Sequence, residues 1–352
     1  MEFFGLRSEK KERGLPRHVR LRRGTADDEF PTFEAMRRTM NMEMNWAHHA
    51  PTRHHLRCSP DSSFWLAEES ALFSPPKVIG YARSMVREGV WCLNEFFMLP
   101  GHQRQGVGGA LLNACLKDGD LAGAHTRLVL ASHHPSADAL YMRRAGCFPR
   151  LPMLLLVGSL SKLSLPEADA ATIRDSVLPP SSAPASTSAF LPLEAEPINL
   201  TPDVQAEIDL LDREIVGYAR PTEHAFWAAC MGGPYRSGRL FRLPAPFGEK
   251  GRLVGYCYLG YETTGPALAV EPADLPRMIH HVVNLSQRLP QPTHEFEFRP
   301  QELYFPLCGS NETMLAWLLG CGWHIAFQYL FMSTHPLGRL DRYVCHNPLY
   351  YL

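Results

Sequence analysis

A glycine-rich segment follows a strand-like run that ends at Leu99-Pro100, and its residue types are suited to holding an anion. The segment reads Gln103-Arg104-Gln105-Gly106-Val107-Gly108-Gly109 and leads directly into residues with helical spacing. Glycines let the backbone approach a ligand closely, and the unpaired N–H groups and positive dipole end of a helix attract negative charge. The pattern therefore predicts a site for a phosphate or pyrophosphate group.

The spacing excludes two common kinds of phosphate loop. No Lys-Ser/Thr pair follows the glycines, as a Walker A loop requires. The G-x-G-x-x-G spacing and the later acidic residue of a dinucleotide-binding fingerprint are also absent.

The elements around this loop predict a mixed α/β domain. Alternating and helically spaced apolar residues indicate a strand over 18–24, a helix after the capping residues 25–28, and three strands over 64–70, 77–89 and 90–99. The last two strands meet at Glu88-Gly89, a typical hairpin turn. After the loop and its helix come a strand over 125–132, a helix over 135–146 and a strand near 153–157.

This combination resembles the GCN5-related N-acetyltransferases, the GNAT superfamily. The spacing Gln103-x-x-Gly106-x-Gly108 after a fourth strand is similar to that family's acyl-CoA pyrophosphate loop, and the run LNEFFMLPGHQRQGVGGALL is similar to its central motif. The resemblance is strong over residues 90–146. It implies an α/β fold, a mostly antiparallel twisted sheet flanked by helices, with acetyl-CoA or another short acyl-CoA as co-substrate and no metal.

The resemblance also implies roles for the residues that bind this co-substrate. The backbone amides of the loop would hold the pyrophosphate, and the strand end before it would hold the pantetheine amides. Arg104, Arg143 or Arg144 could meet the ribose phosphate, although each, taken alone, could equally be an exposed helix arginine. The implied binding residues are Phe97, Met98, Leu99, Gln103, Arg104, Gln105, Gly106, Val107, Gly108, Gly109, His134 and Arg144.

Acyl transfer to an amine needs a base for the amine proton and an acid for the leaving thiolate. The run His134–Tyr141 fits the family segment N-x-x-A-x-x-x-Y, with His134 in place of Asn and Tyr141 as the general acid. However, the family usually has this tyrosine four residues before a closing glycine, whereas Tyr141 precedes Gly146 by five. In that second register Met142 takes the position, and Tyr141 would then simply pack on the sheet.

Glu95 is the candidate general base, because it matches an acidic position in the fourth strand of several family members. Glu68 and Glu69 on a neighbouring strand are the reserves. The alternative for each is a solvated surface carboxylate.

Histidines cluster in NWAHHAPTRHHLR, after the first helix. Adjacent histidines point apart on any regular element, and no acidic or cysteine partner has ligand spacing, so we expect a polar loop lining the acceptor site rather than a metal site. The histidines concerned are His48, His49, His54 and His55.

The C-terminal half repeats part of this organisation. Residues 251–262 resemble the strand over 77–89, and residues 303–333 give a strand, turn, helix and strand like those after residue 126. Glu271-Pro272 stands where the glycine loop would be, and an acid and a proline are poor substitutes for open amides, so this half should not bind CoA. Asp212, Arg213, Arg220 and His224 could form a buried ion network or a second substrate contact.

These observations predict two tandem GNAT-like domains. We expect an N-terminal domain with the acyl-CoA loop over 1–163, a linker rich in Pro, Ser and Ala over 164–200, and a degenerate copy over 201–352. The degenerate copy could stabilise the first domain or form a wall of its acceptor cleft.

The charge composition argues against nucleic acid as a partner. Among 352 residues, 35 Lys plus Arg balance 36 Asp plus Glu for a net charge of -1, so no overall field attracts nucleic acid. No apolar run is long enough to span a membrane, the start lacks the apolar core of a secretory signal, and the nine cysteines form no CxxC pair, so we expect a cytoplasmic protein. We expect it to be a monomer or a homodimer, because two fused copies could replace the dimer that single-domain relatives often form.

The sequence thus predicts an N-acetyltransferase that acts on the primary amine of a small molecule by direct attack in a ternary complex. The alternative is a non-catalytic protein that binds acyl-CoA or another partner through GNAT domains.

Overall fold

The structure is a computed structural model, and it describes residues 14–41, 46–71, 73–132, 134–166, 169, 172–176, 190–230, 235–246, 249–260, 264–288 and 302–346. The chain divides into two compact units. The first consists of residues 1–86 and 93–125, and the second of residues 87–92 and 126–352.

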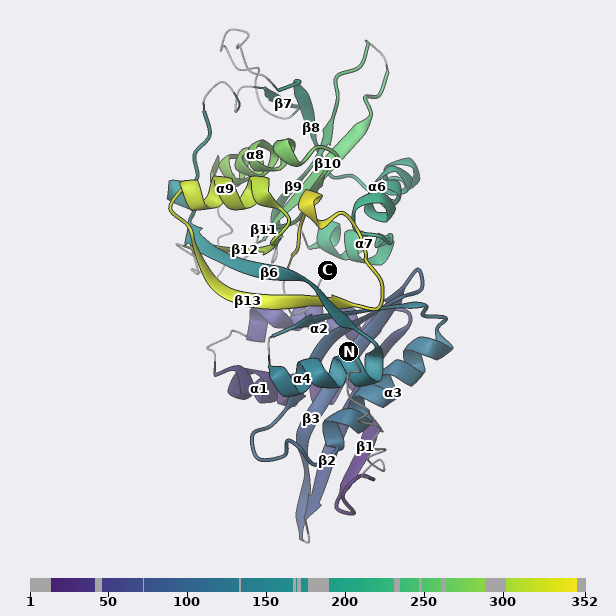
Figure 1. The fold of residues 1–352 in the computed structure, drawn as a ribbon. Helices are drawn as coiled ribbons and strands as arrows, with labels where there is room; N and C mark the ends of the chain where they lie inside the picture. Colours follow the sequence, from purple (N-terminus) through teal and green to yellow (C-terminus); the bar gives the residue numbers. More distant parts are fainter. Residues whose placement is uncertain are drawn as a thin grey trace, which may run out of the picture. The chain divides into compact units, whose positions relative to one another are not determined.

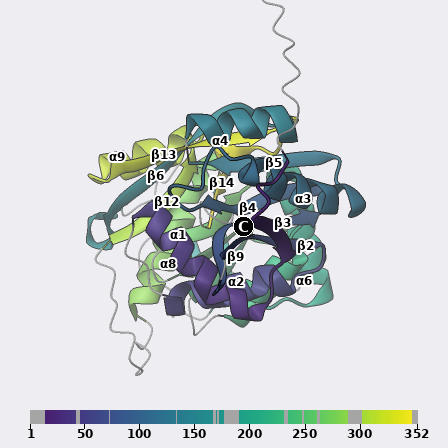
Figure 2. The same cartoon turned by 90° about the horizontal axis from the view of Figure 1, so that it is seen from below.

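The first unit contains the antiparallel strands predicted for the N-terminal part, in the order β1-β2-β3-β4, except for the tip of the β3–β4 hairpin, residues 87–92, which belongs to the second unit. The Glu88-Gly89 turn between β3 and β4 has positive φ at both residues, 45° and 77°, as a tight hairpin requires. Helices α1 and α2 pack against each other (Figure 2), and α3 packs on β2. The elements are β1 (Val19–Arg23), α1 (Glu29–Met40), α2 (Trp46–Cys58), β2 (Ser62–Ala71), β3 (Ser74–Arg87), β4 (Val90–Met98) and α3 (Val107–Leu121).

The second unit is built on a sheet in the order β5-β13-β6-β12-β14-β11-β10-β9-β8-β7. Its strands are β5 (Thr126–Ala131), β6 (Phe148–Ser159), β7 (Ile173–Asp175), β8 (Leu193–Pro197), β9 (Tyr235–Arg242), β10 (Leu253–Gly260), β11 (Thr264–Ala269), β12 (Glu302–Cys308), β13 (His324–Ser333) and β14 (Tyr343–Val344). Its helices are α4 (Pro135–Leu140), α6 (Pro202–Ile215), α7 (Pro221–Ala229), α8 (Leu275–Arg288) and α9 (Glu312–Gly320). Buried residues of β12, α8 and α9 form one core, in which the rings of Phe305 and Trp323 lie 4.9 Å apart.

Strands from the two halves of the chain interleave at one end of this sheet. β13 lies between β5 and β6, pairing with Leu128–Ala131 of the first and with Phe148–Val157 of the second. β6 in turn pairs with β12 through Met153–Ser159, so its partners on both sides come from the C-terminal half. Figure 1 shows β6 and β13 running side by side. Apart from residues 87–92, the boundary between the two units falls after His125, before β5, and the expected linker over 164–200 lies within the second unit.

Both ends of that expected linker contain short strands. β8 pairs antiparallel with β9, and β7 pairs parallel with β8. Leu193 and Ala195 are buried while Glu194 is exposed, which is the alternation of a strand with one buried face. The high content of Pro, Ser and Ala in the whole segment masks this short alternating pattern in the sequence. Residues 177–189 of the expected linker lie outside the described residues.

Candidate functional site

The glycine-rich loop makes a sharp turn between β4 and α3. Gly101, Arg104 and Gly106 all have positive φ, at 87°, 62° and 88°. Gly106 is the N-cap of α3, and the first turn of the helix carries no acidic residue. The N–H groups of Val107, Gly108 and Gly109 belong to this first turn, which has no intrahelical acceptor for them. Four consecutive residues from Gln103 to Gly106 are exposed, so the loop offers open donors to an anion.

Gly108 lets the start of α3 approach β4 closely. A Cβ atom on Gly108 would lie 3.2 Å from Phe96 Cζ and 3.7 Å from Met98 Cγ. The end of β4 remains part of the sheet, because Leu99 N–H donates to Ile79 O at 2.9 Å. The half-buried Phe97, Met98 and Leu99 therefore lie on a firmly held strand end, directly before the loop.

The last turns of α3 are held by Asp118. Its Oδ2 accepts hydrogen bonds from Ser63 and from Trp65 Nε1, the latter at 2.7 Å, and Arg23 binds both carboxylate oxygens at 2.6 and 2.7 Å. Burial opposes ionisation, but these donors lower the pKa of Asp118 below its ordinary value. The helix that presents the loop is thereby fixed to β1 and β2.

Tyr141 begins a π-helical turn, Tyr141–Ala145, that continues α4. The turn ends at Gly146, whose φ is 68° and whose N–H donates to Tyr141 O. Tyr141 is 6% exposed, and burial, together with the nearby charge of Asp138, raises the pKa of its hydroxyl. Met142, the alternative in the second register, is half-buried.

His134 and Arg144, the other predicted residues near Tyr141, lie on the same excursion between β5 and β6. His134 is the N-cap of α4; its carbonyl accepts from Ala137 N–H and Asp138 N–H at 2.9 and 3.0 Å, and its side chain is exposed. Arg144 is half-buried in the π turn. These residues belong to the second unit, whereas Phe97 to Gly109 and Glu95 belong to the first.

Glu95 is paired with two buried arginines. Arg53 Nη1 donates to Glu95 Oε1 at 2.5 Å, and Arg83 Nε lies 3.1 Å from Glu95 Oε2. Arg83 also donates to Glu29 Oε2 at 2.6 Å, and Arg57 Nε lies 3.1 Å from Glu29 Oε1. The Glu95, Arg53 and Arg83 side chains are 0–2% exposed, so the cluster ties α1, α2, β3 and β4 together. Sequence spacing could not reveal this cluster, because Glu29 and Glu95 lie 66 residues apart in the chain.

The reserve carboxylates also have basic partners. Glu68 accepts from Arg22 Nε at 2.7 Å and from Arg20 Nε at 3.0 Å. Glu69 Oε1 lies 3.4 Å from His18 Nε2 and 3.8 Å from His102 Nδ1. Glu69 is the more exposed of the two.

The expectation of a loop over the histidine-rich segment is wrong. Residues 46–58, which include His48, His49, His54 and His55, form helix α2, with Pro51 inside it. The flanking Leu56 and Arg53 are buried, so tertiary packing outweighs the weak helix preference of the histidines. Among the residues that the structure describes, no group of three or more His, Cys, Asp or Glu side chains is arranged to hold a metal ion.

The C-terminal half has an ion network where the sequence left two alternatives open. Arg220 donates to both oxygens of Asp212 at 2.9 and 3.0 Å, and His224 Nε2 lies 3.1 Å from Asp212 Oδ2. His224 Nδ1 is 3.0 Å from the hydroxyl of Tyr258. The side chains of Asp212, Arg220 and His224 are all 0% exposed. Burial alone would raise the pKa of Asp212, but Arg220 and His224 outweigh it and lower this pKa. The cluster therefore packs α6 and α7 on β10. Arg213 is not part of it, because its side chain is exposed and its Nη2 donates to Glu88 Oε1 at 2.6 Å.

The start of α8 differs from the start of α3. Glu271 and a single turn, Pro272–Asp274, precede it, and Asp274 accepts from Arg277 Nη2 at 2.5 Å. Arg277 also donates to Thr172 Oγ1 at 2.8 Å and Leu191 O at 2.7 Å. An acidic side chain and a docked neighbouring segment thus occupy this helix start.

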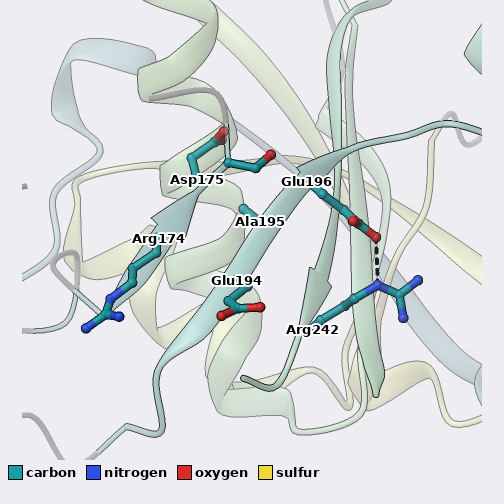
Figure 3. Close-up of a pocket in the computed structure, with 7 residues that line it drawn as sticks. Arg174, Asp175, Glu194, Ala195, Glu196 and Arg242 are labelled. Atoms are coloured by element: carbon teal, nitrogen blue, oxygen red, sulfur yellow. Dashed lines mark hydrogen bonds and ion pairs between the residues drawn. The ribbon is translucent and has the colours of Figure 1, made fainter. Parts of the chain in front are cut away.

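A small open cavity of about 270 Å³ lies beside β7, β8 and β9 (Figure 3). Its lining residues are Arg174, Asp175, Ser176, Glu194, Ala195, Glu196 and Arg242. Glu196 accepts from Arg242 Nε at 2.6 Å, and Asp175 is paired with Arg239 and His281 at 2.8 and 2.9 Å. Its most buried charges are thus already neutralised, and no predicted site residue lines it.

No helix within the described residues is both long and apolar enough to cross a bilayer.

Comparisons with known proteins agree with these features. Residues 32–147 match the model of the acetyltransferase (GNAT) family. None of the curated proteins compared with the chain matches it in sequence.

Solved structures share the fold across nearly the whole chain. A candidate acetyltransferase from Pyrococcus horikoshii is 14% identical with a TM-score of 0.62, over 94% of this chain and 95% of that one. A GCN5-related N-acetyltransferase from Sphaerobacter thermophilus is 12% identical with a TM-score of 0.56, over 94% and 100%. A tandem GNAT protein from the clavulanic acid biosynthesis pathway is 14% identical with a TM-score of 0.54, over 90% and 99%.

These likenesses confirm the predicted fold class, and the family match supports acyl transfer in general. Residues 32–147 thus match the acetyltransferase (GNAT) family, and the chain as a whole has the fold of tandem GNAT proteins.

Proposed function

We propose that the protein transfers an acetyl or other short acyl group from acyl-CoA to the primary amine of a small molecule, by direct attack in a ternary complex. The observation that carries the proposal is the open start of α3, where a glycine N-cap and an acid-free first turn follow β4. Holding both reactants together would supply much of the rate, because it removes the entropic cost of their encounter.

The residues of the first unit fit the phosphate part of acyl-CoA. The amides of Gln103 to Gly109 would bind the pyrophosphate, with Arg104 in the same exposed loop to meet a further phosphate. The firmly held strand end Phe97–Leu99 would bind the pantetheine amides. When bound, acetyl-CoA supplies the activated acyl group.

Tyr141 would act as the general acid. Its raised pKa keeps the hydroxyl protonated at neutral pH, which is the state needed to give a proton to the leaving thiolate. Its place at the start of a π turn supports this role, because such turns are frequent at functional sites.

Glu95 stays a prediction for the general base, and its surroundings favour another role. Both carboxylate oxygens face guanidinium groups, so their lone pairs are shared with cations and are poorly placed to accept an amine proton. A water molecule or the more exposed Glu69 would be less constrained. Glu95→Gln separates these possibilities. The amide cannot act as a base, so a catalytic role would be lost entirely, but its oxygen can still accept a hydrogen bond from Arg53, so a structural role would be partly kept.

The start of α8 supports a silent second half. Anion binding at a helix start depends on open N–H groups and a positive potential, and the carboxylates of Glu271 and Asp274 reduce that potential. We therefore propose one acyl-CoA site per chain.

The test is calorimetric titration of acetyl-CoA into the full chain and into Gly106→Glu. Gly123→Glu is the matched control, because Gly123 also has a positive φ, 79°, and open space around it, but lies beyond the far end of α3. We expect one site per chain in the parent and in Gly123→Glu, and none in Gly106→Glu. No binding by the parent chain would contradict the proposal.

A screen of small-molecule amines, following release of free CoA, then tests transfer. Turnover that disappears in Gly106→Glu but not in Gly123→Glu supports the enzyme. Tight binding without turnover of any amine would favour the non-catalytic alternative.

A further inference from the structure

The end of β13 lies beside the segment that carries Tyr141, although the two are almost 200 residues apart. β13 runs antiparallel to both β5 and β6, and Ser333 is opposite Leu128 on one side and Phe148 on the other. These two positions flank the excursion through α4 and the π turn. The C-terminal half thus supplies the strand that separates the start of β5 from the start of β6.

Thr334, the next residue, makes a reciprocal contact with β5. Its N–H donates to Arg127 O at 3.0 Å, and its Oγ1 accepts from Arg127 N–H at 3.0 Å. Thr334 O accepts from Arg150 Nη2 at 2.7 Å, so β6 is held at the same place. The side chain of Thr334 is therefore needed to pair the backbone N–H of Arg127.

Arg127 continues the contact to the π turn. Its Nη1 donates to Ala145 O at 3.3 Å, at the end of the turn. Gly146 follows, where a Cβ atom would lie 3.7 Å from Thr334 Cγ2, and its N–H donates to Tyr141 O. A continuous set of contacts therefore leads from Thr334 to the backbone of Tyr141.

We propose that Thr334 is a positioning residue for Tyr141, so that the second half acts in the reaction by completing the frame of the first half's proton donor. The inference rests on the proposed function. A general acid must lie within hydrogen-bond reach of the atom it protonates, and a displacement of about 1 Å can cost up to about 100-fold in rate.

The test compares Thr334→Val, which keeps the shape and removes the hydroxyl, with Thr334→Ser, which keeps the hydroxyl. We expect Thr334→Val to lower kcat by about tenfold with an unchanged KM for acetyl-CoA, and Thr334→Ser to restore kcat. Thr201→Val is the matched control, because it also removes a hydroxyl that accepts a backbone N–H, that of Val204 at 3.4 Å, but on α6. It should leave kcat unchanged.

Hydrogen–deuterium exchange gives a readout that does not need activity. Amides of Gly146 and Cys147 should exchange faster in Thr334→Val than in the parent, in Thr334→Ser or in Thr201→Val. Unchanged exchange or unchanged kcat in Thr334→Val would overturn the inference. Faster exchange in a chain whose parent form transfers no acyl group would instead contradict the proposed function and, with it, the catalytic part of this inference.

Discussion

The N–H of Gly146 donates to the carbonyl of Tyr141, five residues earlier, and closes a π turn rather than an α turn. This bond accounts for the spacing that set the sequence apart from the usual family pattern. The turn holds one more residue than an α turn, so the tyrosine and the glycine both keep their places. Gly146 is suited to the end of the turn because its φ of 68° is costly for other residues.

Deleting Met142 should convert the π turn into an α turn without moving Tyr141. The remaining residues would then give the family's usual four-residue spacing, with Ala145 still facing the core. We expect a thermal midpoint within a few °C of the parent's, measured by circular dichroism, and a kcat within about twofold of the parent's, measured by CoA release.

Deleting Ala139 is the control for this change. It removes a residue between the start of α4 and Tyr141, and would rotate the tyrosine by about 100° about the helix axis. We expect this variant to lose activity. Equal damage from the two deletions would show that the π turn is not an accommodated insertion.

Tyr141→Phe should lower kcat with little effect on the KM for acetyl-CoA, by about 10²- to 10⁴-fold if the hydroxyl is the general acid. The raised pKa also predicts a pH profile. A hydroxyl whose pKa lies above its ordinary value of about 10 stays protonated throughout the range from about pH 8 to pH 10, so kcat should not fall there through loss of the Tyr141 proton.

Steady-state kinetics of Tyr141→Phe and Met142→Leu across this range check both points. Met142→Leu preserves apolar volume at the alternative position and should behave as the parent. A kcat in Tyr141→Phe equal to that of the parent would rule out the assignment.

Local sequence was sufficient for the elements that position the loop. β1 to β4, α3 and β5 lie where alternation, helical spacing and the Glu88-Gly89 turn placed them, because these signals depend on near neighbours. Gly106 and Gly108 could be singled out in the same way, since a positive φ and a close helix approach are local demands.

Contacts between distant segments could not be predicted. The ion pairs of Glu95 with Arg53 and Arg83 join α2, β3 and β4, and no spacing rule connects those three residues. The pairing of β13 with both β5 and β6 could not be predicted either, because an apolar strand pattern does not specify which strands will be its neighbours. The histidine-rich helix was missed because its buried face is small and its residue types are weak helix formers.

The buried cluster around Glu95 predicts non-additive stability changes. Arg53→Met alone should destabilise the chain by about 3–5 kcal/mol, because Glu95 loses a partner while remaining buried. Arg53→Met combined with Glu95→Leu removes both charges and should recover most of that loss, leaving Arg83 paired with Glu29.

Urea unfolding of the parent, both single variants and the double variant measures the coupling free energy. Arg37→Met with Glu34→Leu, a half-buried surface pair on α1, serves as the control cycle and should couple by less than about 1 kcal/mol. A Glu95 cycle no stronger than this control would show that the cluster does not hold β4.

The interleaved strands predict that the chain cannot be divided at residue 163. A fragment of residues 1–163 would keep β5 and β6 but lose β12 and β13, the strands paired with both edges of β6 and with one edge of β5. The apolar run from Met153 to Val157 would then have open backbone groups on both sides, which favours aggregation.

We expect the fragment to be insoluble or to unfold without a cooperative transition, whereas a chain ending at His346 retains every described strand and should unfold like the parent. Adding residues 190–352 as a separate chain should restore a soluble complex, because it returns β12 and β13. A soluble monomeric fragment of residues 1–163 with a sharp thermal transition would contradict this interdependence and would show that the first half closes its sheet without strands from the second.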